Sequence, residues 1–281
     1  MMNSIGHALY LFAGFVSVQI WGRLNRSMQF AISALAARFY NTHLSAFLIK
    51  PYCWWHYGNP NHYQGFLPGS GTQRYQTFQD FFTRDFREPP KIYSESIWPC
   101  EGYLCDFGKA KELPTIKVKG EAREIPSIFG REIPRQSYFS NVFLHNNNYH
   151  HIHAPVSGKI LRIRRIPGEL LLLRPWAYRN NPSIPALTNE RVNVDILDRV
   201  GREWLLSIVG GPLVATIRLP EYLRINAPIE IGQKLATFEM GSTCCMVSPI
   251  ATEASIGSHV QMGAPFENEP SRRLKKYVFV R

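Results

Sequence analysis

Phe238-Glu-Met-Gly-Ser-Thr-Cys-Cys-Met246 places a Gly-Ser pair between two segments that favour β-structure. Residues 234–240 have the composition of a strand and an apolar run follows, so a tight turn is expected at Gly241 and Ser242. Glycine gives this turn backbone freedom and leaves its carbonyl group open to attack by the neighbouring serine hydroxyl. On these residues alone, the plain alternative is a β-turn whose serine only hydrogen-bonds the backbone.

The length and composition describe a globular, basic protein. The 281 residues suffice for one large domain, or for one domain with an extension, and a hydrophobic content of 45% argues against disorder. Twenty glycines and twenty prolines, scattered along the chain, favour many turns and short strands over a helical bundle. The net charge is +11 and no Asp or Glu precedes Asp80, so an anionic partner is expected, either nucleic acid or an acidic membrane.

The cysteines do not predict a disulfide framework, because they are sparse and odd in number. Cys100 and Cys105 lack a second pair that would complete a zinc site, so reduced structural thiols are expected. The five cysteines are Cys53, Cys100, Cys105, Cys244 and Cys245.

The N-terminal residues 1–50 are expected to associate with a membrane. Residues 5–21 are apolar, but at about 17 residues they are at the short limit for a span, which needs about 20. Residues 28–50 predict an amphipathic helix that carries only basic charges and lies at the interface. A buried N-terminal helix is the alternative.

The rest of the chain divides into a linker and a β-rich body. Residues 51–74 predict an irregular linker whose Trp54 and Trp55 suit a membrane interface, and residues 75–86 predict a short helix. Residues 75–281 form the expected catalytic domain, of α+β class and mainly β, because short β-forming runs alternate with turn signals. The clearest of these runs are residues 115–119, 159–163, 191–195 and 204–209.

Three histidines stand close together in the chain, at His150, His151 and His153. In an extended strand His151 and His153 share one face and His150 lies on the other. Metal binding is the weaker interpretation, because no carboxylate or cysteine stands beside them at ligand spacing. Acid–base chemistry is favoured, and Glu101, His153 and Ser242 could form an acid–His–Ser triad if the fold brings them together.

Six short boxes, in order, resemble those of the phosphatidylserine decarboxylase proenzymes. Together they are far more specific than any one of them. They are Phe81-Phe82-Thr83-Arg84, Pro99-Cys-Glu-Gly102, Val118-Lys-Gly120, Tyr149-His150-His151-Ile152-His153-Ala154-Pro155, Asn189-Glu-Arg-Val192 and Gly241-Ser-Thr243. Trp21-Gly-Arg-Leu-Asn25 looks most like the mitochondrial-type members.

The resemblance implies that the chain cuts itself between Gly241 and Ser242. The Ser242 hydroxyl, activated by His153 and Glu101, would attack the Gly241 carbonyl, leaving a β chain of residues 1–241 and an α chain of residues 242–281. Ser242 would become a pyruvoyl group, the cofactor for decarboxylation of phosphatidylserine to phosphatidylethanolamine. His150 would lie near the substrate.

The resemblance also implies partners and a location. The two fragments are expected to remain together, with a homodimer as a further expectation. An anionic phospholipid membrane, in particular the mitochondrial inner membrane, is expected to hold the protein. No metal site is expected, and nucleic acid ranks lower because no binding motif accompanies the charge.

Three positions depart from the family's boxes, and two other functions stay open. Glu101 stands where the family has Asp, Asn148 replaces an acid, and His151 replaces an Arg. A non-catalytic relative that binds a membrane or a partner is therefore one alternative.

A carrier domain is the other alternative, because residues 153–160 and 229–235 also resemble biotinyl/lipoyl half-motifs. The turn at Glu239-Met-Gly-Ser lacks the lysine that a carrier needs, so this likeness predicts architecture only: two barrel-sandwich-like β half-units.

Overall fold

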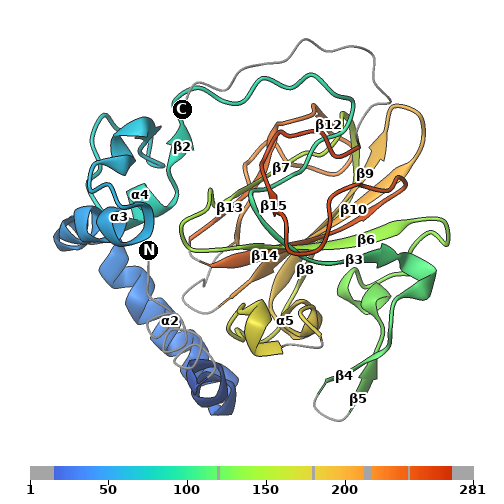
Figure 1. The fold of residues 1–281 in the computed structure, drawn as a ribbon, viewed down its shortest axis with the longest axis horizontal. Helices are drawn as coiled ribbons and strands as arrows, with labels where there is room; N and C mark the ends of the chain where they lie inside the picture. The colour runs from blue at the N-terminus through green and yellow to red at the C-terminus, as the bar shows by residue number, and fades with distance from the viewer. Residues whose placement is uncertain (1–15, 119–120, 179–180, 212–216, 240, 268–281) are drawn as a thin grey trace.

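The computed structural model describes residues 16–118, 121–178, 181–211, 217–239 and 241–267. The helices within residues 16–82 gather on one side of the molecule, its helical side, and strands form the body (Figure 1). The helical elements are residues 16–23, α2 (Arg26–Tyr40), η1 (His43–Leu48), α3 (Ile49–Tyr57), η2 (His62–Gly65), α4 (Phe78–Phe82), η3 (Ala110–Glu112), η4 (Ile125–Ile128), η5 (Pro175–Tyr178) and α5 (Ile184–Thr188).

The largest sheet has eight antiparallel strands in the order β12-β8-β9-β10-β14-β6-β3-β15. Its strands are β3 (Gly102–Lys109), β6 (Tyr138–Leu144), β8 (Gly158–Ile166), β9 (Arg191–Asp198), β10 (Glu203–Gly210), β12 (Pro228–Ile229), β14 (Ser242–Ser248) and β15 (His259–Val260). β14 lies between β10 and β6, well inside this sheet.

A second, three-stranded sheet orders β11 (Ile217–Arg218), β13 (Lys234–Phe238) and β7 (His151–His153). Two small hairpin-like pairs complete the strands: β1 (Phe66–Leu67) with β2 (Asp85–Phe86), and β4 (Ile116–Val118) with β5 (Glu121–Arg123). β13 leads directly into β14, so the chain passes from the small sheet to the large one at the Gly-Ser turn.

Both faces of the large sheet are covered, which explains why all seven residues of β14 are buried. Alternate side chains of a strand point to opposite faces. Cys244 and Met246 accordingly join the core shared with the small sheet, whereas Cys245 and Val247 join the core under β4, η4 and α5. A strand buried on both faces reads as a continuous apolar run, as residues 244–247 do.

The helix α2 buries polar side chains and exposes apolar ones. Its N-cap is Asn25, whose side chain accepts a hydrogen bond from the Met28 amide. Gln29 and Ser33 are the buried residues, and the Gln29 amide group bonds Trp21 O, Leu24 O and the Leu170 amide of the body. The exposed large hydrophobic residues of α2 are Met28, Ile32, Leu35 and Phe39.

The β-rich α+β class is confirmed, and so are the strands expected near residues 115, 159, 191 and 204. The helical predictions need correction. The helix expected over 28–50 ends at Tyr40 and gives way to η1, the linker expected over 51–74 is helical as far as Tyr57, and the short helix covers only α4. The side chain of Asn41 bonds the Ala37 carbonyl, which helps to end α2 early.

Two expectations about architecture are not confirmed. The sheets do not confirm two barrel-sandwich-like half-units. Most of the apolar segment at residues 5–21 lies outside the described residues. In the part of the chain that is described, no helix is long and apolar enough to cross a membrane.

Candidate active site

The Gly-Ser turn lies between the end of β13 at Phe238 and the start of β14 at Ser242. Gly241 has a φ of 31°, a left-handed conformation that side chains other than glycine rarely adopt. Ser242 is fully buried and pairs with Gly210 of β10 and Leu144 of β6. Gly241 thus has the positive φ that suits the expected turn, and Ser242 begins a strand that the sheet holds on both sides.

His150 is the histidine that contacts this serine. Its Nδ1 lies 3.3 Å from Ser242 Oγ, and its ring stacks on Phe82 of α4 with the ring centroids 4.1 Å apart. Its Nε2 is buried without a hydrogen-bond partner among the described residues. Burial, followed by the charge of Arg84, lowers the pKa of His150 well below its usual value, so the imidazole is neutral near pH 7.

Arg84, the last residue of the Phe-Phe-Thr-Arg box, holds the loop before His150. Its guanidinium is buried and donates hydrogen bonds to the carbonyls of Asn147 and Asn148, at 2.9 and 3.0 Å. It also donates to the Tyr57 hydroxyl of α3, at 2.9 Å. One side chain therefore connects the helical side of the molecule to the loop that carries His150.

The Asn-Glu-Arg-Val box supports the strand beside Ser242. Asn189 donates to the carbonyls of Leu171 and Gly210 and accepts from the Leu171 amide. Since Gly210 pairs with Ser242, Asn189 fixes the neighbour of the Gly-Ser turn. The box is thus a structural support for the site.

His151 and His153 lie on the opposite face of β7 from His150, as strand alternation predicts. His153 Nδ1 lies 2.7 Å from the Gly232 carbonyl oxygen, and its Nε2 lies 3.2 Å from the Tyr149 hydroxyl. His151 contacts Thr237 Oγ1 and the Thr83 carbonyl oxygen. Burial, with the charge of Lys234, lowers the pKa values of His153 and His151 to about 4 and about 3.

Glu101 has different partners from those expected. Its Oε1 accepts a hydrogen bond of 2.8 Å from Asn148 Nδ2, and His259 Nε2 lies 3.9 Å from the same oxygen. Asn148 also contacts His259 Nε2 at 2.9 Å. Asn148, which departs from the family's acid, therefore supplies the amide that Glu101 binds.

The structure does not assemble the expected relay of Glu101, His153 and Ser242 in hydrogen bonds. Both ring nitrogens of His153 contact groups other than Ser242. Neighbouring residues of an extended chain alternate in direction, so His150 points toward Ser242 and His153 points to the other side. The contact that the sequence assigned to His153 is made by His150. The catalytic roles of these residues remain predictions.

Among the described residues, no group of three His, Cys, Asp or Glu side chains could hold a metal ion. All five cysteines are free, and four of them are buried. Burial raises the pKa values of the Cys100 and Cys245 thiols, which disfavours reactive thiolates.

Sequence reasoning did not predict the contacts of four residues around the site: Phe82, Arg84, Asn148 and His259. Phe82 and Arg84 were visible as members of a box, but the box did not say what they touch. His259 lies 158 positions from Glu101 and belongs to no box, so no local pattern could have found it.

Comparison with known proteins agrees with the order of these elements. The model of the phosphatidylserine decarboxylase family matches residues 78–266, from the start of α4 to the end of the described body. The chain belongs to the phosphatidylserine decarboxylase family. Residues 1–77, which include α2 and α3, lie outside the match.

Several phosphatidylserine decarboxylase proenzymes are similar to this chain. That of Psychrobacter arcticus is 27% identical over 219 residues, covering 69% of this chain and 78% of the relative. That of Psychrobacter cryohalolentis is 28% identical over 214 residues, covering 67% and 76%. That of Azoarcus sp. is 27% identical over 198 residues, covering 62% and 68%.

Proposed function

We propose that this chain is a phosphatidylserine decarboxylase that makes its own pyruvoyl cofactor from Ser242. The observation that carries the proposal is the contact of a buried, neutral imidazole, His150, with a buried serine on a left-handed glycine turn. Membership of a family whose relatives are named proenzymes supports a cleavage step. The substrate and product, phosphatidylserine and phosphatidylethanolamine, follow from the names of those relatives.

Self-cleavage uses groups that lie at the turn. The Ser242 oxygen attacks the Gly241 carbonyl carbon, the peptide C–N bond breaks, and an ester forms while the hydroxyl proton passes to the released amine. Elimination then transfers the Cα proton of residue 242 to a base and breaks its Cβ–O bond, leaving Gly241 with a carboxylate and residue 242 as dehydroalanine. Water hydrolyses its imine tautomer and ammonia leaves, so residue 242 keeps a ketone.

His150 is the described base that contacts Ser242, so we assign proton transfer at this residue to it. The resemblance assigns the activation of Ser242 to His153 and Glu101. For that assignment to hold, His153 must exchange its contacts with Gly232 and Tyr149 for one with Ser242. In the present arrangement Glu101 positions the loop through Asn148.

The surroundings of Ser242 fit a pyruvoyl group. This group supplies an electron-accepting carbonyl that binds an amine and stabilises the charge left when CO2 departs. His150 Nε2, buried and without a partner among the described residues, is free to hold a substrate carboxylate or to move a proton. The seven paired residues of β14 would keep the fragments 1–241 and 242–281 together after cleavage.

A membrane location is part of the same proposal. The apolar face of α2 is exposed and its flanking charges, Arg23, Arg26 and Arg38, are basic, which suits an anionic bilayer. The mitochondrial inner membrane and a homodimer remain predictions from the resemblance.

The proposal is tested with vesicles that contain phosphatidylserine. Purified full-length protein is expected to form phosphatidylethanolamine and CO2, measured by lipid mass spectrometry and trapped gas. The variant Ser242→Ala, which keeps the strand but lacks the hydroxyl, is expected to form neither. Product from Ser242→Ala equal to that of the original chain contradicts the proposal, and no product from either chain favours the non-catalytic alternative.

A further inference from the structure

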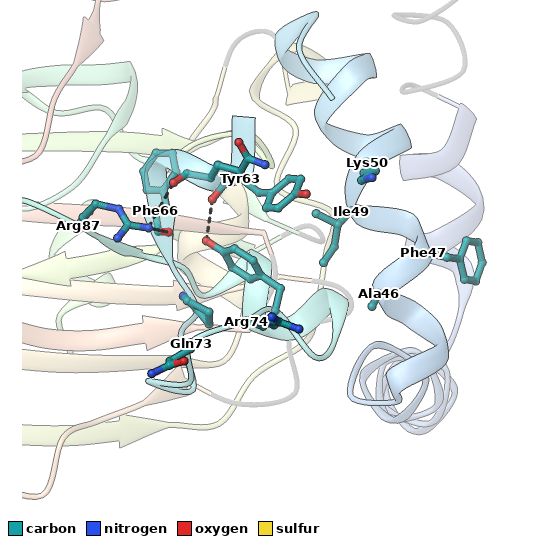
Figure 2. A pocket seen from close by; sticks show the side chains of 12 residues that line it. Ala46, Phe47, Ile49, Lys50, Tyr63, Phe66, Gln73, Arg74 and Arg87 are labelled. Atoms are coloured by element: carbon teal, nitrogen blue, oxygen red, sulfur yellow. Dashed lines mark hydrogen bonds between the residues drawn. The ribbon is translucent and has the colours of Figure 1, made fainter. Parts of the chain in front are cut away.

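A cavity of about 500 Å³ opens between the helical side of the molecule and the segment around β1. Figure 2 shows Ile49 and Lys50 on one side, Phe66 and Arg87 on the opposite side, and Arg74 between them. The volume is in the range of small-molecule binding sites. None of the reaction-site residues Glu101, His150 and Ser242 lines it.

The cavity is basic and lacks acidic groups. Lys50, Arg74 and Arg87 line it, and no Asp or Glu does. None of the three forms an ion pair with a described carboxylate that would satisfy its charge. Arg87 donates only long bonds, 3.4 Å each, to the carbonyls of Gln64 and Phe66. Three cations that face one hollow favour an anionic ligand.

Apart from Gln64 and Gln73, the remaining lining residues are apolar or aromatic. Ile49 is buried, and the rings of Tyr63 and Tyr75 pack edge to face. The Tyr75 hydroxyl donates to the Tyr63 carbonyl at 3.0 Å, so it is already used within the wall. A ligand with an anionic group and a hydrocarbon part matches this combination of cations and apolar surface.

The surface around the cavity indicates where such a ligand comes from. The elements that form one wall, η1 and α3, expose Leu44, Phe47, Trp54 and Trp55, each at 60% or more. Exposed Trp and Leu side chains beside basic residues are typical of a membrane interface. A lipid is therefore a better match than a water-soluble phosphate.

We propose that this cavity binds the phosphate-bearing headgroup of an anionic membrane phospholipid, at a site separate from the reaction site. Lys50 and Arg74 would hold the phosphate, and the wall of Ile49 and Tyr75 would contact the start of the acyl chains. Phe66 links the two sites physically, because the Arg84 guanidinium lies 5.0 Å from its ring centroid. The site does not depend on cleavage at Ser242.

The test uses dihexanoyl phosphatidylglycerol, kept below its micelle concentration and titrated into full-length protein by calorimetry. The double variant Lys50→Ala/Arg74→Ala is expected to bind at least about tenfold more weakly, because two charge-assisted contacts are lost. The matched control is Lys111→Ala/Arg135→Ala, which removes the same two charge types from another basic hollow of the body. Lys50→Arg/Arg74→Lys is expected to keep binding.

The outcomes separate the alternatives. Saturable binding that only Lys50→Ala/Arg74→Ala weakens supports the proposal. The proposal is overturned if the original chain does not bind the lipid, or if Lys50→Ala/Arg74→Ala and Lys111→Ala/Arg135→Ala lose affinity equally. It is also overturned if neutral dihexanoyl phosphatidylcholine binds as tightly as dihexanoyl phosphatidylglycerol. Equal binding of inorganic phosphate would instead identify a site for soluble phosphate and also overturn it. A chain that binds this lipid but fails to cleave itself leaves the proposal standing and refutes only the proposed function.

Discussion

The reaction site and the helical side of the molecule differ in how far their side chains are exposed to solvent. Ser242 and His150 are fully buried, lie in strands or beside them, and belong to the part that matches the family. The helices α2 and α3 lie outside the match and expose Leu35, Trp54 and Trp55, although Ile49 and Cys53 of α3 are buried in the core. The proposed reacting groups are thus shielded from water, whereas the helical side exposes large apolar side chains, as the membrane contact that we propose requires.

The two regions are nevertheless joined by several hydrogen bonds, and those of Arg84 lead to the reaction site. Arg84 bonds Tyr57 of α3 on one side and the carbonyls of Asn147 and Asn148 on the other. Phe82, two residues earlier, stacks on His150. A change in the helical side therefore has a direct path of packed side chains to the reaction site.

The largest expected effect on the buried region comes from His150→Ala. Loss of the proton-transferring group should reduce the rate of phosphatidylethanolamine formation per cleaved chain by about 100-fold or more. The matched control is His43→Ala, which removes an exposed histidine of η1 and should leave the rate unchanged. Equal rates for His150→Ala and the original chain would show that His150 takes no part in the decarboxylation.

A time course of self-cleavage can decide whether His150 or His153 activates Ser242. In His153→Ala the resemblance predicts slow self-cleavage, which is followed by denaturing electrophoresis over time. If His153→Ala stays uncut while His150→Ala cuts normally, the activation of Ser242 belongs to His153, and β7 must rearrange before cleavage.

A smaller effect is expected from the exposed face of α2. The double variant Leu35→Gln/Phe39→Gln should weaken binding to anionic vesicles by about thirtyfold, because roughly 1 kcal/mol of apolar transfer is lost per side chain. Val200→Gln/Ile256→Gln, at exposed apolar positions of the body, serves as the control. Vesicle co-sedimentation measures both, and equal losses in the two double variants would show that α2 has no special role.

The last prediction concerns stability rather than function, and it arises from the buried histidines. His151 and His153 have pKa values of about 3 and about 4 in the folded chain, below the ordinary 6.5, because burial disfavours their charged forms. The unfolded chain therefore binds more protons below pH 6.5, so stability falls as pH falls from 6.5 to 4. The expected slope is about 1 kcal/mol per pH unit for each histidine.

Denaturant unfolding of the uncut Ser242→Ala chain at several pH values measures this slope. His153→Gln, which has no imidazole to protonate, should reduce it, whereas His43→Gln should not. A stability that is constant from pH 6.5 to 4 would show that these histidines are protonated in the folded chain.

Local patterns in the sequence predicted much of the body and little of the site's contacts. Strands such as β9 and β10 follow from short β-forming runs, and the turn at Gly241 follows from its flanking segments. The separation of His150 from His151 and His153 follows from strand alternation. These features depend on neighbours in the chain.

The rest depends on partners far away in the chain. The polar residues Gln29 and Ser33 are buried because Gln29 bonds the distant Leu170, and this inverts the usual orientation of an amphipathic helix. Glu101 meets Asn148 and His259 only because β3 and β15 pair at the edge of the large sheet. No period or spacing encodes such contacts.

The mass of the purified full-length protein, measured under denaturing conditions, tests the central claim most directly. The account predicts two fragments, residues 1–241 and 242–281, with the second lighter than its unmodified sequence by one ammonia because a ketone replaces the serine amine. Ser242→Ala should give one intact chain. An intact mass of 32.3 kDa that persists in the original chain after long incubation would contradict the account.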